Sequence, residues 1–75
     1  MNEFISKAAL EARRARYKPG VRVELVRFED PYSSLKPGDR GTVEFLDDTG
    51  SVHIKFDNGS SLGVLYGVDE IRLVE

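Results

Sequence analysis

The fold is decided by residues 52–64, which read VHIKFDNGSSLGV. Apolar residues stand at every second position from Val52 to Phe56, the period that is typical of a β-strand with one buried face. Asn58-Gly59 follows and marks a hairpin, in which we expect a type I′ turn because both residues tolerate a positive φ angle. The returning strand covers residues 61–64. This stretch therefore predicts an antiparallel hairpin with one side in the core.

The same period of two recurs in three further segments of the chain. Residues 21–26 alternate in this way, and Val43 and Phe45 are expected to face the core from a second strand. Residues 71–74 form a short last strand. One turn of 3₁₀ helix is expected just before it, at residues 67–70.

The connections between these strands indicate the architecture. The connection at residues 28–38 is long for a hairpin and has the length of a functional loop, whereas residues 47–50 form a tight turn. Short strands joined in this manner are typical of an SH3-like barrel. We therefore predict a mainly β fold, with a five-stranded SH3-like β-barrel over residues 19–75 preceded by one N-terminal α-helix within residues 1–18.

The N-terminal segment predicts an amphipathic helix, because residues 2–17 contain neither Gly nor Pro and Pro19-Gly20 then ends the run. One apolar stripe at three- and four-residue spacing comprises Phe4, Ile5, Ala8, Ala12 and Ala15. A helix of about 15 residues is marginal alone in water, so we expect Phe4 and Ile5 to dock onto the barrel or onto a second copy of the chain.

Four apolar residues have the opposite parity to the core residues of their strands: Val26, Leu46, Leu65 and Val74. Some of them should point outward unless the helix covers them. A homodimer, formed by helix exchange or by packing of these faces, is the alternative to docking of the helix within one chain.

Composition excludes several classes of protein. The chain has 75 residues, enough for one small domain, and its 40% apolar and 32% charged content is ordinary for a globular fold. Without cysteine it has neither disulfides nor a thiolate metal site. No apolar run reaches the roughly 20 residues of a membrane span, and the N-terminus lacks the basic start, apolar stretch and small-residue cleavage site of a signal peptide. We expect a cytoplasmic protein with no membrane partner.

The net charge of −2 hides an asymmetry between the two parts of the chain. Residues 1–19 hold five basic and two acidic side chains, a charge of +3, whereas residues 20–75 hold six basic and eleven acidic ones, a charge of −5. The two parts would therefore attract different partners.

Several short motifs are spread over residues 17–74. They read YKPGVRVEL from residue 17, DPY from residue 30, GDRGTV from residue 38, DD from residue 47, VHIKFDNGSSLG from residue 52 and GVD from residue 67. Together they resemble the bacterial domain-of-unknown-function family numbered four-three-one-four. The resemblance implies an SH3-like fold, a phage- or plasmid-like context and no established activity. Relatives carry Trp where this chain has Phe56, so a tryptophan platform is not expected here.

The chain lacks the residue sets that catalysis needs, and we expect neither an enzyme nor a bound cofactor or metal. The single histidine, His53, is expected on the outward face of a strand in a cross-strand contact. Asp47 and Asp48 suit a turn, in which short carboxylates bind local backbone amides, and they lack the spacing of a calcium loop.

Binding of a protein or peptide is the leading hypothesis. The long first loop, together with a tyrosine before the last strand, would form an aromatic and acidic groove suited to a basic or proline-containing peptide. The candidate residues are Phe28, Asp30, Tyr32, Leu35 and Tyr66. The structural alternative is that the large apolar side chains of the loop complete a small core.

Two other functions stay open. The basic segment Arg13, Arg14, Arg16 and Lys18 could bind nucleic acid through its phosphates, although basic residues also simply suit a helix C-terminus. Alternatively, the acidic barrel could mimic nucleic acid and occupy a basic host protein, a hypothesis that rests on charge and analogy.

Overall fold

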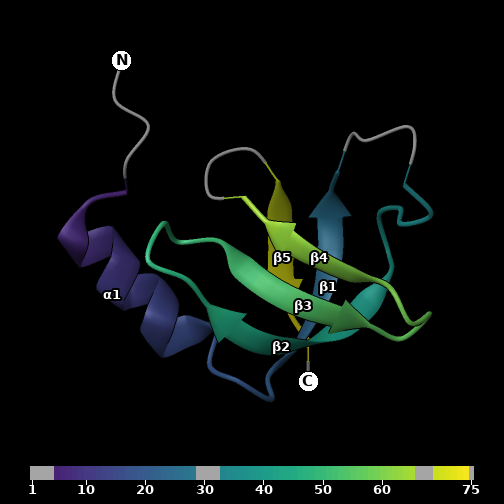
Figure 1. The fold of residues 1–75 in the computed structure, drawn as a ribbon, viewed down its shortest axis with the longest axis horizontal. Helices are drawn as coiled ribbons and strands as arrows, with labels where there is room; N and C mark the ends of the chain where they lie inside the picture. Colours follow the sequence, from purple (N-terminus) through teal and green to yellow (C-terminus); the bar gives the residue numbers. More distant parts are fainter. Residues whose placement is uncertain (1–4, 29–32, 66–68, 75) are drawn as a thin grey trace.

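The structure is a computed structural model that describes residues 5–28, 33–65 and 69–74. Helix α1 comes first, and five antiparallel strands follow in one sheet of order β4-β3-β2-β1-β5 (Figure 1). The bounds are α1 (Lys7–Arg16), β1 (Arg22–Arg27), β2 (Arg40–Leu46), β3 (Val52–Phe56), β4 (Ser61–Val64) and β5 (Glu70–Leu73). The predicted class, mainly β with one helix before five strands, is confirmed. Of the expected 3₁₀ turn at residues 67–70, residues 67 and 68 lie outside the described residues, and Glu70 belongs to β5.

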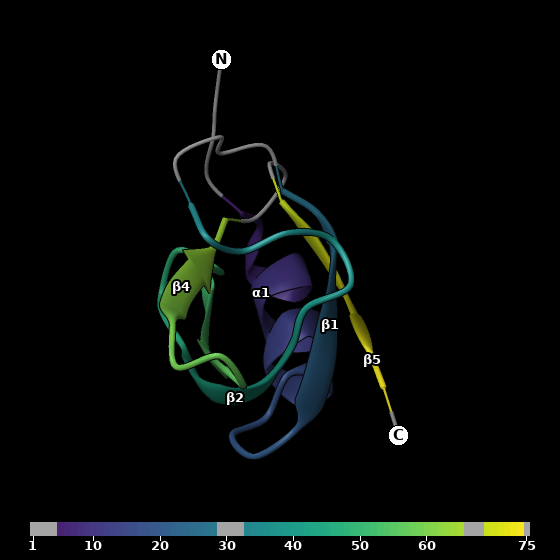
Figure 2. The ribbon, with the colours of Figure 1, turned by 90° about the vertical axis from the view of Figure 1, so that its right-hand side faces the viewer.

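The sheet curls around its interior in the manner of a small barrel. Seen along its edge, β1 and β5 lie on one side of the interior and β4 on the other (Figure 2). Strands β4 and β5 are the two edges of the sheet, and within the described residues they do not pair with each other, so the sheet is not closed. Helix α1 lies at one end, beside the turn between β2 and β3 (Figure 1).

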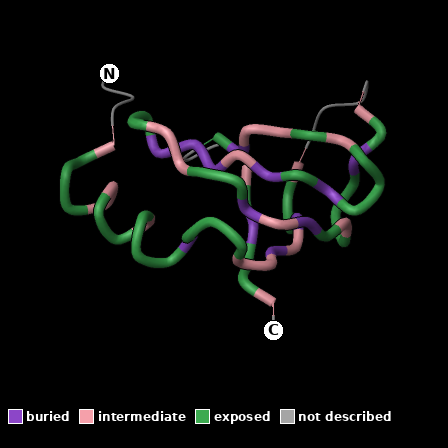
Figure 3. The backbone as a smooth tube through the Cα atoms, turned by 60° about the horizontal axis from the view of Figure 1, so that its bottom comes forward, coloured by how far each residue is buried: buried purple, intermediate pink, exposed green. Residues whose placement is uncertain are grey.

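The core lies inside this curl, and the helix contributes little to it (Figure 3). Alternate residues of the strands supply most of the buried side chains, as the sequence pattern predicts. The buried apolar residues are Tyr17, Val23, Leu25, Leu35, Val43, Val52, Ile54, Phe56, Val64 and Ile71. Tyr17, directly after α1, is the anchor that ties the N-terminal segment to the sheet.

The expectation that Phe45 faces the core is wrong. The pairing of β2 with β3 shifts between Val43 and Phe45, which inserts Glu44 as an extra residue, a β-bulge. The alternation therefore slips by one position, so that Phe45 is 50% exposed while Leu46 packs partly against the core. A second shift, next to Val26 in β1, leaves that residue exposed as its parity suggested. Leu65 is also exposed, and Val74 is half-buried.

The predicted hairpin between β3 and β4 is confirmed, but its turn type differs from the prediction. Within this turn only Gly59 has a positive φ angle, of 95°. Asn58 therefore does not adopt the conformation that a type I′ turn needs. The amide of Gly59 donates to the carbonyl of Phe56 at 3.0 Å, and the amide of Phe56 donates to the carbonyl of Ser60 at 2.7 Å. This pattern is a type I turn followed by a glycine bulge.

The alanine stripe of the helix is not its docking face. Ala8, Ala12 and Ala15 are exposed, and α1 has no buried residue. Alanines bury little apolar surface, so they do not decide how the helix lies. Arg13, which binds the carbonyl of Gly50, is half-buried instead, and so is Leu10. Ile5 is half-buried as well, and Phe4 lies outside the described residues.

Gly41 allows a close approach of β2 to β3. A Cβ atom at this position would lie 2.6 Å from the carbonyl oxygen of Lys55 and 2.9 Å from the Cα of Phe56, both backbone atoms that cannot move aside. We predict that Gly41→Ala lowers the free energy of unfolding by about 2–3 kcal/mol, since overpacking strains the pair of strands. Urea unfolding followed by circular dichroism measures the change. Lys55→Ala on the facing strand is the control, with an expected change of about 0.5 kcal/mol or less; equal effects of the two variants would contradict this reading.

Candidate functional site

An exposed aromatic pair lies on the outer face of the sheet. Phe45 of β2 and His53 of β3 are cross-strand partners. Their rings stack with centroids 4.2 Å apart and planes inclined by 9°. The bulge at Glu44 places Phe45 there, since without the extra residue its side chain would point inward. The expected cross-strand position of His53 is thus observed, with Phe45 as a partner that the sequence pattern did not suggest.

Gly63 makes room for the imidazole ring on the neighbouring strand. It is the partner of His53 in β4, and a Cβ atom there would come within 3.1 Å of Cε1 and 3.3 Å of Nδ1. Any larger residue at this position would displace the ring. Phe45, His53 and Gly63 therefore form one row across β2, β3 and β4.

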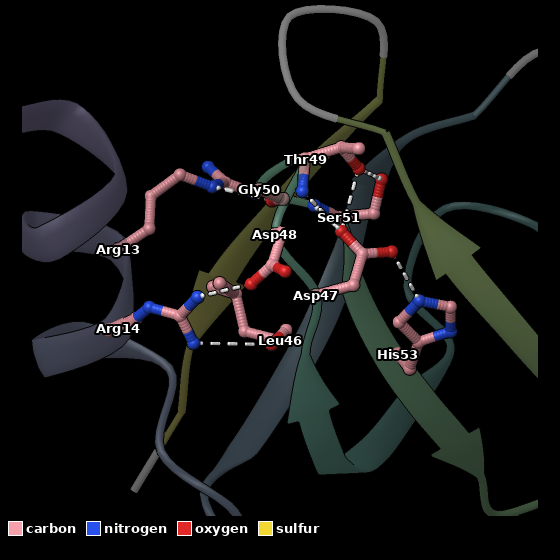
Figure 4. A network of polar contacts seen from close by, with 9 residues as sticks. All are labelled: Arg13, Arg14, Leu46, Asp47, Asp48, Thr49, Gly50, Ser51 and His53. Atoms are coloured by element: carbon pink, nitrogen blue, oxygen red, sulfur yellow. Dashed lines mark hydrogen bonds and ion pairs between the residues drawn. The ribbon is translucent and has the colours of Figure 1, made fainter. Parts of the chain in front are cut away.

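Asp47 holds the histidine from the turn after β2 (Figure 4). Its Oδ2 lies 2.8 Å from Nε2 of His53, and its Oδ1 accepts hydrogen bonds from the Thr49 hydroxyl at 2.6 Å, the Thr49 amide at 2.9 Å and the Ser51 amide at 3.1 Å. The Thr49 hydroxyl is the main cause that lowers the pKa of Asp47 well below its usual range, and His53 and the two amides add to it against the opposing effect of burial. The carboxylate thus stays ionised and keeps both the turn and the ring in place.

Two arginine side chains of α1 bind the same turn (Figure 4). Nε of Arg13 donates to the carbonyl of Gly50 at 2.9 Å, and the guanidinium of Arg14 contacts Asp48 at 3.0 Å and the carbonyl of Leu46 at 3.4 Å. Arg13 also lies over the ring of Tyr17, 5.3 Å from its centroid. Half of the basic segment that could bind nucleic acid therefore attaches the helix to the barrel.

A shallow pocket opens beside the aromatic pair. It has a volume of about 250 Å³ and is lined by Glu44, His53, Ile54, Ser61, Leu62 and Gly63. Pockets for drug-sized molecules usually measure about 300–1,000 Å³, so this one is sized for a single side chain. We call Glu44, Phe45, His53, Ser61 and Gly63 the Phe45 surface. Glu44 is the charged residue of this surface, and it makes no hydrogen bond or ion pair with any described residue.

The outer face around β1, by contrast, carries ion pairs that join β1 to β2, to β5 and to the turn after β3. Glu24 accepts from Arg40 and from Arg72, each at 3.1 Å, and Arg22 binds Asp57 at 2.7 Å. The Arg22 guanidinium lowers the pKa of Asp57 by its hydrogen bonds. These charges already satisfy one another and attract a partner less than an unpaired group does.

The loop residues chosen from the sequence are only partly brought together. Leu35 is 6% exposed and belongs to the core, and Phe28 packs half-buried against that core. For these two residues the structure agrees with the alternative to a binding role, in which the apolar side chains of the loop complete the core. A buried Leu35 cannot contact a partner of the folded domain. Asp30, Tyr32 and Tyr66 lie outside the described residues. Of the basic residues, Arg16 and Lys18 are exposed, and Arg16 lines a second pocket of about 240 Å³ with Ala12, Arg13 and Tyr17.

Within the described ranges, no group of three His, Asp or Glu side chains gathers in a way that could hold a metal ion. No helix among these residues is long and apolar enough to cross a membrane.

Comparison with known families places the chain in one of them. Residues 6–74, nearly the whole sequence, match the family Domain of unknown function (DUF4314), and the chain belongs to that family. The resemblance seen in the motifs is thereby confirmed. No curated protein matches the chain.

Sequence reasoning missed Glu44 and Phe45. Their side chains follow the strand alternation until the bulge, and no glycine or proline marks the bulge in the sequence. The outward position of His53 and the role of Asp47 in a turn could be predicted from the sequence. A histidine in an alternating strand and an aspartate shortly before a glycine both have local sequence signatures.

The ionisation of Asp47 makes the stability of the domain depend on pH. The pKa of Asp47 is lower in the folded than in the unfolded protein, so its charge stabilises the fold above the unfolded-state pKa of about 4, and this contribution is lost as the pH falls through the folded value. We predict that Asp47→Asn lowers the free energy of unfolding by about 1–2 kcal/mol at neutral pH. The difference in this free energy between the variant and the wild type should become smaller below pH ~4. Urea unfolding over a range of pH values measures both.

Asp48→Asn is the matched control for this experiment. The Asp48 side chain is 98% exposed, so its ion pair with Arg14 contributes about 0.5 kcal/mol or less. A gap between the wild type and Asp47→Asn that stays constant from neutral to acid pH would show that the charge of Asp47 does not stabilise the turn.

Proposed function

We propose that this chain is a non-catalytic interaction module that binds a protein or peptide partner through the Phe45 surface. The observation that carries the proposal is the exposure of Phe45, whose ring is half uncovered although the structure around it is tightly organised. A domain of this size has use for every large apolar side chain in its core, so an aromatic ring held outside is a candidate for contact with a partner.

The surface is organised in advance of binding. Stacking on His53 restricts the Phe45 ring, Asp47 restricts His53, and α1 restricts the turn that carries Asp47. A rigid aromatic side chain loses little conformational entropy when a partner covers it. Burying the exposed half of a phenylalanine contributes about 2–3 kcal/mol, the size of an interface hot spot.

The charge of the barrel indicates the kind of partner. Residues 20–75 carry a charge of −5, which attracts basic segments. The proposal places the main contact on the Phe45 surface; Asp30 and Tyr32 of the long first loop, which lie outside the described residues, stay additional candidates from the sequence. It includes a cytoplasmic location and a phage- or plasmid-like context, the second of which rests on the family resemblance.

Alanine at Phe45 tests this proposal directly. Peptides selected on the wild-type domain from a random display library would be synthesised, and their affinities measured by fluorescence anisotropy. We predict that Phe45→Ala weakens binding by about 30-fold, equivalent to about 2 kcal/mol, with little change in thermal stability because the ring lies outside the core.

Leu73→Ala is the control for this measurement. Leu73 is 43% exposed, close to the value for Phe45, but it lies on β5 at the other edge of the sheet. Its truncation should change affinity less than about twofold. Equal effects at the two positions, or a library that yields no binder, would reject the Phe45 surface as the binding site.

Nucleic-acid binding is the second candidate, and the exposure of Arg16 and Lys18 favours it. Neither side chain makes a hydrogen bond or ion pair with another described residue. If they contact phosphates, the double variant Arg16→Gln/Lys18→Gln should reduce the slope of log K against log salt for a short single-stranded DNA by about 1.4. An unchanged slope would exclude this function. Binding of a basic protein in competition with DNA would instead support mimicry of nucleic acid by the acidic barrel.

A further inference from the structure

Glu44 differs from most of the other carboxylates of the barrel. Six of the described acidic residues between 20 and 75 already accept a hydrogen bond or ion pair from within the domain: Glu24, Asp39, Asp47, Asp48, Asp57 and Asp69. Glu44 and Glu70 make no such contact with any described residue. Of these two, Glu44 lines a pocket.

The surroundings of Glu44 limit what can enter this pocket. The β-bulge presents Glu44 next to Phe45, opposite His53, and the pocket extends from there over Ser61 and Gly63 of β4. The imidazole ring, already covered by Phe45 on one side, forms one wall. The ring itself fills the space above Gly63, so the open part of the pocket lies beside the ring, between Glu44 and Ser61. A planar group could lie there with one aromatic wall and a carboxylate that lines the same pocket.

We propose that this pocket receives an arginine side chain of the partner. The guanidinium lies against the part of the His53 ring that faces the pocket and donates to the carboxylate of Glu44, and the Ser61 hydroxyl is a further acceptor at the rim. This inference rests on the proposed function and names the chemistry of the partner. The negative charge of the barrel, with Asp47 ionised behind the ring, draws the cation toward this face.

Arginine fits better than the alternatives on chemical grounds. Its planar fork of donors matches a carboxylate with two parallel hydrogen bonds, and it stacks on aromatic faces at a lower desolvation cost than an ammonium group. Lysine offers a point charge that gains neither the stacking nor the paired hydrogen bonds. A phosphate or other anion is disfavoured, because Glu44 and Asp47 would both repel it.

The test uses three capped pentapeptides that differ only at the central residue. The parent is acetyl-Gly-Thr-Arg-Thr-Gly-amide, and the other two carry citrulline, which has the shape of arginine without its charge, or lysine. Binding to the full chain is followed by two-dimensional amide NMR. We expect saturable shifts centred on Glu44, His53 and Gly63 with the arginine peptide, about tenfold weaker binding of the citrulline peptide and at least about threefold weaker binding of the lysine peptide.

Glu44→Gln and Glu70→Gln form the matched pair of variants. Both remove one exposed carboxylate that has no partner among the described residues, so both should keep the fold, and both change the net charge from −2 to −1. Glu44→Gln should weaken the binding of the arginine peptide about tenfold, so that it binds no more tightly than the citrulline peptide. Glu70→Gln should leave the affinities of both peptides unchanged within about twofold. Comparison of the two variants separates a contact at Glu44 from a general effect of charge.

The possible failures are distinguishable. Three results would each overturn the arginine site. The citrulline or the lysine peptide could bind as tightly as the arginine peptide, the two glutamate variants could change its affinity equally, or the pocket residues could show no NMR shifts. If Phe45→Ala still weakens the selected peptides in that case, the proposed interaction surface stands and only the chemistry of its partner is wrong. If Phe45→Ala has no effect on them, the proposed function itself fails.

Discussion

The arrangement of the outer face depends on a single extra residue in β2. The bulge at Glu44 reverses the direction of every side chain that follows it in the strand, so that Phe45 points to solvent and Leu46 toward the core. The same shift sets the point at which the chain leaves β2, and hence the place of Asp47 above His53. A strand without the bulge would bury Phe45 and leave the His53 ring without its stacking partner.

The polar network around the turn between β2 and β3 carries this arrangement to the helix. Asp47 satisfies three donors of its own turn and one atom of the His53 ring, and the outer side of the turn is bound by Arg13 and Arg14. Polar networks keep one geometry when each member has a partner, and none of the buried polar side-chain atoms described is left without one. The helix thereby acts as a support for the turn, with Tyr17 as its apolar anchor.

Two regions of the outer face of the sheet illustrate how a small acidic barrel separates stability from binding. Around β1, carboxylates and guanidinium groups are matched to one another. Around Glu44 the charge is unmatched and lies next to an exposed ring. Surface ion pairs contribute little individually to stability, so the unpaired state of Glu44 costs the fold little and leaves its carboxylate available to a partner.

The sequence by itself determined the helix, the five strands, the hairpin at Asn58-Gly59 and the long first loop, because period-two alternation, glycine and proline act through the local backbone. It did not determine the direction of Phe45, the turn type at Gly59, the burial of Leu35 or the use of Arg13 and Arg14. Only the tertiary structure decided these, since they depend on how neighbouring strands absorb an extra residue and on which distant segment lies opposite each side chain. A bulge costs little and leaves no local signature, yet it determines which aromatic ring the domain shows to its surroundings.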